Sequence, residues 1–196
     1  EELGIEGKLI GIDIDRSAPA FHIVDKNYLV PKVRDKNFIP ELFSICKTEN
    51  VDLVIPLIDP ELGILAENKA RFDKIGTRIL ISDSDVVNIT DDKLNTYKYF
   101  VKNKIPTAEI FDIDSITTPK GQPKFPLLIK PRIGSAGKSV EKINTEQELR
   151  FYYNKITDPI IQEYINGDEF TLDVLVDFNG QVKCVVPRKR LSIRAG

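Results

Sequence analysis

The sequence predicts an α/β domain with a parallel sheet, followed by an α+β region with antiparallel strands. Strand-like and helix-like segments alternate up to about Ser82, which is typical of a parallel sheet of the doubly wound kind. From Pro159 onward, runs with alternating apolar residues meet at Asn179-Gly180, a dipeptide that favours a two-residue hairpin turn. We therefore expect three parts, at residues 1–88, 89–158 and 159–196.

The expected first part contains five elements. In chain order they are a strand at Lys8–Asp15, a helix at Phe38–Glu49, a strand at Val51–Ile58, a helix at Pro60–Phe72 and a short strand at Arg78–Ser82. The apolar run of the second strand is expected to be buried on both faces of the sheet. Asp13 and Asp15 lie where a Rossmann fold places its ribose-binding acid. The glycine fingerprint that should precede such an acid is not visible, so a structural or substrate-side role is favoured.

The following region mixes helices and strands. Asp91-Asp92-Lys93 opens a helix that runs to about Asn103, with Thr90 or Asp91 as its expected cap. A short strand follows Ile105-Pro106-Thr107, and residues 117–123 are expected to form a loop. Thr145-Glu146-Gln147-Glu148 has the form of a capping box and predicts the start of another helix. In the last part, Phe170, Leu172, Val174 and Val176 are expected to point inward from one strand of the hairpin.

Composition excludes several classes of protein. The 196 residues are 41% hydrophobic and 30% charged with a net charge of −2, so the molecule as a whole does not attract nucleic acid. A membrane span or a secretion signal is not indicated, because the chain lacks an apolar run of the necessary length. Two distant cysteines and one histidine, His22, argue against a disulfide framework or a zinc site, so the cytoplasm is the expected location. His22 itself is expected to be partly buried. The absence of methionine leads us to expect that the sequence starts inside a longer protein.

The segment from Leu127 to Val140 carries the strongest chemical signal. It joins a strand to a loop of small residues, Gly134, Ser135, Ala136 and Gly137, whose backbone N–H groups can approach a polyphosphate. Lys130, Arg132 and Lys138 supply positive charge. A P-loop is disfavoured, because Arg132 stands where its first glycine belongs and because a strand, rather than a helix, follows the loop. A flap over phosphates and an ordinary glycine hairpin turn both remain open.

Taken together, these features resemble the ATP-grasp superfamily. The resemblance rests on three motifs in a fixed order. They are the Asp-Lys helix start, Leu-Ile-Lys-Pro-Arg with its glycine-rich flap, and Gln-Glu-Tyr-Ile-Asn-Gly-Asp-Glu-Phe at residues 162–170. The resemblance is closest to ligases like carbamoyl phosphate synthase, of the split large subunit type. It implies an incomplete Rossmann-like, pre-ATP-grasp N-terminal domain followed by an ATP-grasp domain that is truncated at its C-terminus.

The resemblance also implies a role for each matching residue. Lys93 and Lys130 would bind the phosphates of ATP, and Ser135, Ala136, Gly137 and Lys138 would close over them. Glu163 would accept a hydrogen bond from the adenine amino group, the backbone of Tyr164 and Ile165 would bind the purine edge, and Glu169 would bind the ribose. Arg188 or Arg190 would face the γ-phosphate or an acyl phosphate, as catalytic groups. The alternatives are a solvated lysine at 93, exposed strand carboxylates at 163 and 169, and a solvated basic edge at 188–194.

The implied activity is ATP-dependent ligation of a carboxylate, or of bicarbonate, with an amine or ammonia. An acyl phosphate would form from Mg²⁺·ATP and would then be converted to an amide or carbamoyl product. The Mg²⁺ ligands are expected beyond Gly196, so the 196-residue chain alone is expected to be inactive. A partner subunit or a homodimer is possible in this family. The alternative is a non-catalytic nucleotide-binding module, either regulatory or half of a split enzyme.

Overall fold

The computed structural model describes residues 7–116, 124–134, 137 and 139–191. The chain divides into two compact units, residues 1–88 and 89–196, which we describe separately. The expected loop at 117–123 and three flap residues, Ser135, Ala136 and Lys138, lie outside the described residues.

The first unit pairs its strands in parallel, as predicted. Its elements are β1 (Ile10–Asp13), a 3-10 turn (Pro19–His22), β2 (Lys26–Leu29), α1 (Phe38–Glu49), β3 (Leu53–Val54), α2 (Asp59–Asp73) and β4 (Arg78–Ile79). Strand β1 pairs with β2, and β3 pairs with β4. The core lies between these strands and the two helices, and its most deeply buried members are Leu65, Phe72, Ile79 and Cys46. Strand β2 was not expected from the sequence.

The prediction of a buried strand at Val51–Ile58 is wrong for most of these residues. Only Leu53 and Val54 pair with a neighbouring strand, and Leu57 is 86% exposed. The cause is the start of α2, because the Glu61 side chain accepts hydrogen bonds from the backbone N–H groups of Leu57 (2.6 Å) and Ile58 (3.1 Å). Backbone donors used to cap a helix do not serve a strand ladder.

The acidic end of β1 is a structural turn. Asp13 accepts a hydrogen bond from the Asp15 N–H (2.9 Å), and Asp15 accepts from both the N–H and the hydroxyl of Ser17. These bonds hold the chain as it leaves the strand, which agrees with the structural role preferred from the sequence. His22 is exposed, so the expectation that it is partly buried is wrong.

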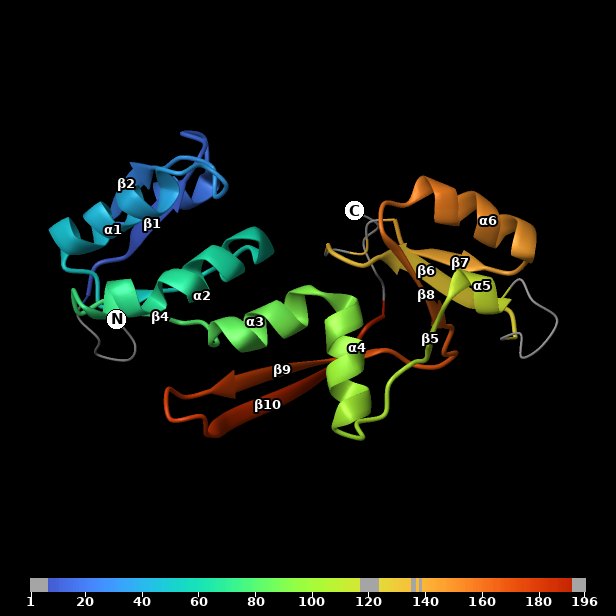
Figure 1. Cartoon of the computed structure of the whole chain (residues 1–196). Coiled ribbons are helices and arrows are strands. Elements are labelled where there is room, and N and C mark those ends of the chain that lie inside the picture. Colours follow the sequence, from blue (N-terminus) through green and yellow to red (C-terminus); the bar gives the residue numbers. More distant parts are fainter. Residues whose placement is uncertain (1–6, 117–123, 135–136, 138, 192–196) are drawn as a thin grey trace. The chain divides into compact units, whose positions relative to one another are not determined.

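The second unit is built on a four-stranded sheet with the order β5-β8-β6-β7. It contains α4 (Lys93–Lys102), β5 (Ile110–Phe111), α5 (Ile113–Ile116), β6 (Leu127–Pro131), β7 (Glu141–Ile143), α6 (Glu146–Lys155), β8 (Pro159–Glu163), β9 (Phe170–Val176) and β10 (Val182–Lys189). A further helix, α3 (Ser84–Asp91), spans the division between the two units. All pairs within the sheet are antiparallel. Helix α6 lies along one face of this sheet (Figure 1) and buries Leu149 against Leu127, Ile129 and Ile161.

Capping decides where the helices of this unit begin. The Asp92 carboxylate accepts hydrogen bonds from the backbone of Leu94 (2.9 Å) and Asn95 (3.3 Å) at the start of α4. Asp92 is therefore the cap, and the expectation of Thr90 or Asp91 is wrong, because residues up to Asp91 belong to α3. The predicted cap of α6 is confirmed, since the Thr145 hydroxyl accepts from the Glu148 N–H at 3.2 Å.

Strand β8 corrects the expected boundary at residue 158. It pairs with both β5 and β6 and so lies in the middle of the sheet, rather than in a following part. The sequence pattern predicts a strand at this position but does not say which strand it joins.

The hairpin of β9 and β10 forms its own two-stranded sheet. Phe170, Leu172, Val174 and Val176 are 42–60% exposed, so the expectation that they point into a core is wrong for the described chain. The predicted two-residue turn also differs. Asp177 N–H donates to Gln181 O at 2.9 Å, which leaves three residues in the loop, and Gly180 has φ +77°. Glycine adopts this left-handed conformation readily, as three-residue hairpin loops require.

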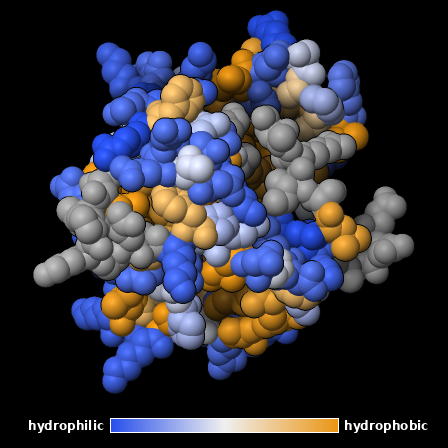
Figure 2. Space-filling view, turned by 90° about the vertical axis from the view of Figure 1, so that its right-hand side faces the viewer, coloured by the Kyte–Doolittle hydropathy of each residue, from blue (hydrophilic) through white to orange (hydrophobic). Residues whose placement is uncertain are grey.

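The described helices include none that is long and apolar enough to cross a membrane. The face drawn in Figure 2 is mostly hydrophilic, with hydrophobic side chains in separate patches.

Candidate functional site

Lys130 lies on the face of the sheet opposite α6. Side chains alternate along β6, so Leu127 and Ile129 point to the core and are buried, whereas Lys130 points to the other side. On that side its ammonium Nζ donates a hydrogen bond to Gln162 Oε1 at 2.6 Å. Gln162 stands opposite Leu128 in β8, which places it diagonally across from Lys130.

The contact of Gln162 with Lys130 was not expected from the sequence. The Gln162 side-chain amide donates to the Ala108 carbonyl at 3.3 Å, so the amide links Lys130 to the segment before β5. The pKa of Lys130 is lowered, first because the ammonium is partly buried and second because the Lys93 ammonium repels it. An acceptor on Gln162 offsets part of the cost of burying this charge.

Lys93, the first residue of α4, also lies at the start of the flap. Its Nζ donates to the backbone carbonyls of Gly134 at 2.7 Å and Arg132 at 3.2 Å. Partial burial lowers the pKa of Lys93, although Asp91 and Asp92 act in the opposite direction. The structure thus brings two of the predicted phosphate-binding lysines close enough to repel each other.

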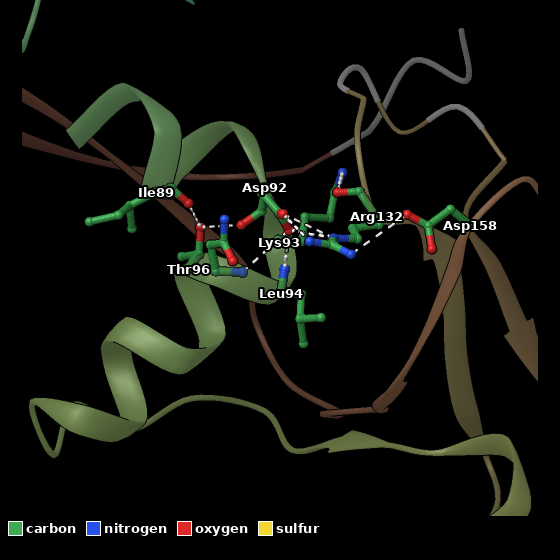
Figure 3. A network of polar contacts seen from close by, with 8 residues as sticks. Ile89, Asp92, Lys93, Leu94, Thr96, Arg132 and Asp158 are labelled. Atoms are coloured by element: carbon green, nitrogen blue, oxygen red, sulfur yellow. Dashed lines mark hydrogen bonds and ion pairs between the residues drawn. The ribbon is translucent and has the colours of Figure 1, made fainter. Parts of the chain in front are cut away.

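Arg132 does not add to this positive charge. Its Nε lies 2.9 Å from each carboxylate oxygen of Asp92, and its second guanidinium nitrogen lies 2.5 Å from Oδ2. Figure 3 shows the guanidinium between Asp92 and Asp158, and the longer contact to Asp158 is 3.9 Å. The pKa of Asp92 is lowered to about 2, mainly by the hydrogen bonds from Arg132.

The flap begins with backbone that favours glycine. Gly134 has φ +126° and Gly137 has φ +69°, and a Cβ built at either position would have no heavy atom within 4 Å. The requirement at these two positions is therefore conformational rather than steric. The strand expected after the flap is present as β7, so the glycines join two strands as the sequence predicts.

The predicted adenine-binding residues lie at the end of β8 and directly after it. The backbone N–H of Glu163 donates to Glu109 O at 2.8 Å, and its carboxylate accepts from the Glu109 N–H at 3.4 Å. Alternation along β8 gives Gln162 and Glu163 opposite faces, so the Glu163 carboxylate does not share a face with Lys130. Tyr164 is held by Lys142, whose ammonium lies 4.2 Å from the ring centroid, and Ile165 is exposed.

The remaining predicted residues pair with each other in the hairpin. Arg190 contacts Glu169 at 2.8 Å, and Arg188 forms an ion pair with Asp173. Arg188, Arg190 and Thr171 also line an open surface hollow. All four charged groups are exposed, so these ion pairs contribute little to stability. Among the described contacts, those of this group stay within the hairpin and do not reach Lys93 or Lys130.

The charges of the two lysines favour a negatively charged ligand. Two ammonium groups that repel each other and are partly desolvated gain stability from a negatively charged ligand, and the adjoining loop has the glycines that a close backbone approach needs. Within the described ranges, no group of three or more His, Cys, Asp or Glu residues is placed to hold a metal ion.

Comparison with known proteins identifies the family. The profile of the family described as "ATP-grasp domain" matches residues 90–195, and that of "PylC-like, N-terminal domain" matches residues 1–80. The chain belongs to the ATP-grasp family. The predicted order of an N-terminal α/β domain and an ATP-grasp domain is confirmed.

Curated relatives with this fold carry the names of ligases and related enzymes. The chain is 26% identical over 185 residues to a carbamoyl-phosphate synthase of Methanobrevibacter smithii, covering 92% of this chain and 48% of that protein. It is 30% identical over 199 residues to a formate-dependent phosphoribosylglycinamide formyltransferase of Prochlorococcus marinus, covering 92% and 49% respectively. The chain therefore spans about half the length of the curated relatives it matches.

Solved structures share the fold at lower identity. The biotin carboxylase domain of Hydrogenobacter thermophilus 2-oxoglutarate carboxylase, solved with MgADP and bicarbonate, matches 92% of this chain and 44% of its own, at 20% identity and a TM-score of 0.67. N5-carboxyaminoimidazole ribonucleotide synthetase from Thermotoga maritima matches 95% and 47%, at 22% identity and a TM-score of 0.66.

Proposed function

We propose that the chain forms the nucleotide-binding part of an ADP-forming ligase. This enzyme joins a small carboxylate, or bicarbonate, to an amine or ammonia. The observation that carries the proposal is the convergence of Lys93 and Lys130 at the base of a glycine loop in a chain of the ATP-grasp family. The name of the carbamoyl-phosphate synthase relative supports the substrate class, and the solved neighbour with MgADP supports the nucleotide.

Lys130 and Lys93 are proposed to bind the phosphates of ATP. An ammonium group has three donors, so Lys130 can keep its bond to Gln162 and still offer protons to phosphate oxygens. Lys93 would exchange a backbone carbonyl of the flap for a phosphate oxygen. The flap residues 135–138 would close over the β- and γ-phosphates and exclude water from the reacting atoms.

The other predicted roles remain part of the proposal. The segment Glu163–Ile165 would bind adenine, and Glu169 would bind ribose. Arg188 and Arg190 would face the phosphate that is transferred, where a guanidinium forms two parallel hydrogen bonds. For this, each arginine must leave the carboxylate it contacts in the hairpin, which costs little because those ion pairs are exposed.

Mg²⁺ is proposed to be held by residues that do not belong to positions 1–196. When bound, the metal neutralises charge on the phosphates during transfer. The lysines of this chain supply the remaining positive charge and fix the position of the nucleotide.

An ADP-release assay tests this function. The complete gene product is incubated with Mg²⁺·ATP, first with bicarbonate and ammonia and then with a panel of carboxylates and amines. We expect ADP release that depends on both substrates and falls at least about a hundredfold in the Lys130→Ala variant. The 196-residue chain alone should bind nucleotide weakly without releasing ADP. Tight ADP binding by the complete gene product, without turnover on any substrate pair, would instead identify a non-catalytic nucleotide-binding module.

A further inference from the structure

The start of α4 and the turn before β8 both contact Arg132. Its guanidinium contacts Asp92 at the start of α4, its backbone N–H donates to Asp158 O at 2.9 Å before β8, and its carbonyl accepts from Lys93 Nζ. Arg132 is the last residue before the flap, which begins at Ile133. The contacts in Figure 3 therefore join the first helix of the domain to the base of the flap.

We propose that Asp92 and Arg132 are positioning residues that place the Lys93 ammonium beside Lys130 for phosphate binding. This inference rests on the proposed function and deepens it, because it assigns to an ion pair the geometry of the phosphate site. It also corrects the sequence-based interpretation of Arg132 as a free cation for the phosphates.

The geometry of the ion pair supports a positioning role for Arg132. The guanidinium contacts both oxygens of one carboxylate, and this carboxylate also caps α4. Only 11% of the Asp92 side chain is exposed, so release of Arg132 toward a phosphate would leave a poorly hydrated carboxylate without its partner. Removal of one partner from such a pair is costly.

The pair also restricts where Lys93 can lie. Asp92 forms an isolated antiparallel bridge with Ile133, and the Lys93 backbone N–H donates to Arg132 O at 3.3 Å. The Lys93 ammonium then reaches the carbonyls of Arg132 and Gly134. Two ammonium groups repel each other, and fixed contacts between α4 and the flap base oppose their separation.

The test compares ADP affinity with adenosine affinity in the complete gene product. Asp92→Asn keeps a side chain that caps a helix but removes the charge that holds Arg132. We expect ADP to bind about tenfold more weakly, within the range for groups of one ion-pair network, while adenosine affinity stays unchanged. The matched control is Glu146→Gln, which removes a carboxylate–arginine pair from the first turn of α6 and should leave both affinities unchanged.

A double-mutant cycle separates positioning from a general loss of structure. In a Lys93→Ala background, Asp92→Asn should cause no further loss of ADP affinity, because the group it positions is gone. An equal loss in both backgrounds would overturn the proposal, and so would tighter ADP binding by Asp92→Asn, which would show that the freed Arg132 is a phosphate ligand.

Two further outcomes are informative. If Lys93→Ala and Lys130→Ala leave ADP affinity unchanged, the proposed function fails. If both variants weaken ADP binding while Asp92→Asn does not, only the positioning role fails.

Arg132→Lys is a second variant for the same test. It keeps the charge but loses the contact of one guanidinium with both carboxylate oxygens, and it should show the same loss of ADP affinity as Asp92→Asn. If neither variant folds, the pair is a folding requirement and the positioning role is rejected.

Discussion

The position of Lys130 in β6 explains why its pKa is lowered. The neighbouring residues Leu127 and Ile129 anchor the strand in the core, and alternation then directs Lys130 to the opposite face. Partial burial and the nearby Lys93 make its charged form less stable than in water, which lowers its pKa. The negative charge of a phosphate would favour the charged form and so offset both effects.

Gln162 is expected to matter because it holds this ammonium. Replacement of Gln162 by Met keeps the length of the side chain but removes the acceptor at 2.6 Å. We expect ADP affinity to fall about ten- to hundredfold, since a lost hydrogen bond to a charged group costs about 1.5–3 kcal/mol. Calorimetric titration measures this, with Gln147→Met on the exposed side of α6 as the control. An unchanged affinity would show that Lys130 does not depend on Gln162.

The lowered pKa of Lys130 predicts a pH dependence of nucleotide binding. Only the protonated lysine binds phosphate well, so ADP affinity should fall as pH rises through the pKa of Lys130, below the range of an ordinary lysine. Lys130→Arg should flatten this fall, because a guanidinium stays charged throughout. The measurement is the ADP dissociation constant from pH 7 to 10, with the exposed Lys98→Arg as control. A profile that is the same in all three proteins would exclude Lys130 as the titrating group.

The sequence identifies some site residues and misses others for a physical reason. Lys130 can be recognised because a charged residue directly follows three apolar ones in a strand. Gln162 cannot, because its contact depends on the register between β6 and β8. The role of Arg132 depends on its contact with Asp92 at the start of α4, and this contact is likewise a property of the tertiary structure.

At the scale of elements, the docking of α4 depends on one carboxylate. Asp92 caps the helix and binds Arg132, and these contacts lower its pKa to about 2 from 3.8. A lowered pKa means that the charged form stabilises the folded state above the unfolded pKa. This contribution is then lost as pH falls through the folded pKa.

This linkage predicts how acid affects the protein. Asp92→Asn should lower the free energy of unfolding by about 2 kcal/mol near neutral pH, which corresponds to the pKa shift. The difference between wild type and variant should shrink between about pH 4 and pH 2. Thermal unfolding across this range measures it. Glu146→Gln, which breaks an exposed ion pair, should cost no more than about 0.5 kcal/mol. A difference that does not change with pH would contradict the account.

The helices were predicted unevenly, since α3 and α5 were not expected from the sequence, whereas α1 and α6 were. The start and end of α1 match the prediction, and Thr145 was identified as a cap, because periodicity and capping are local properties. The strand at Val51–Ile58 failed because its apolar side chains satisfy the pattern without being covered in the described chain. Whether an element is buried depends on the tertiary contacts that it makes, and its own sequence does not specify these contacts.

For the whole molecule, the central claim is that one nucleotide site extends from Lys93 and the flap to the end of β8. The family profile and the solved neighbours establish the fold, and the chain covers about half of its curated relatives. The location of the site in this chain rests on the contacts of Lys93 and Lys130.

Hydrogen exchange of the complete gene product, with and without ADP, tests this claim most directly. A bound nucleotide slows exchange of the backbone amides that it contacts or orders. We predict slower exchange in residues 129–140 and 163–169 and at the start of α4. We predict no change at the acidic turn after β1. Protection confined to residues 8–30, or no protection of residues 129–140 at a saturating ADP concentration, would contradict the assignment.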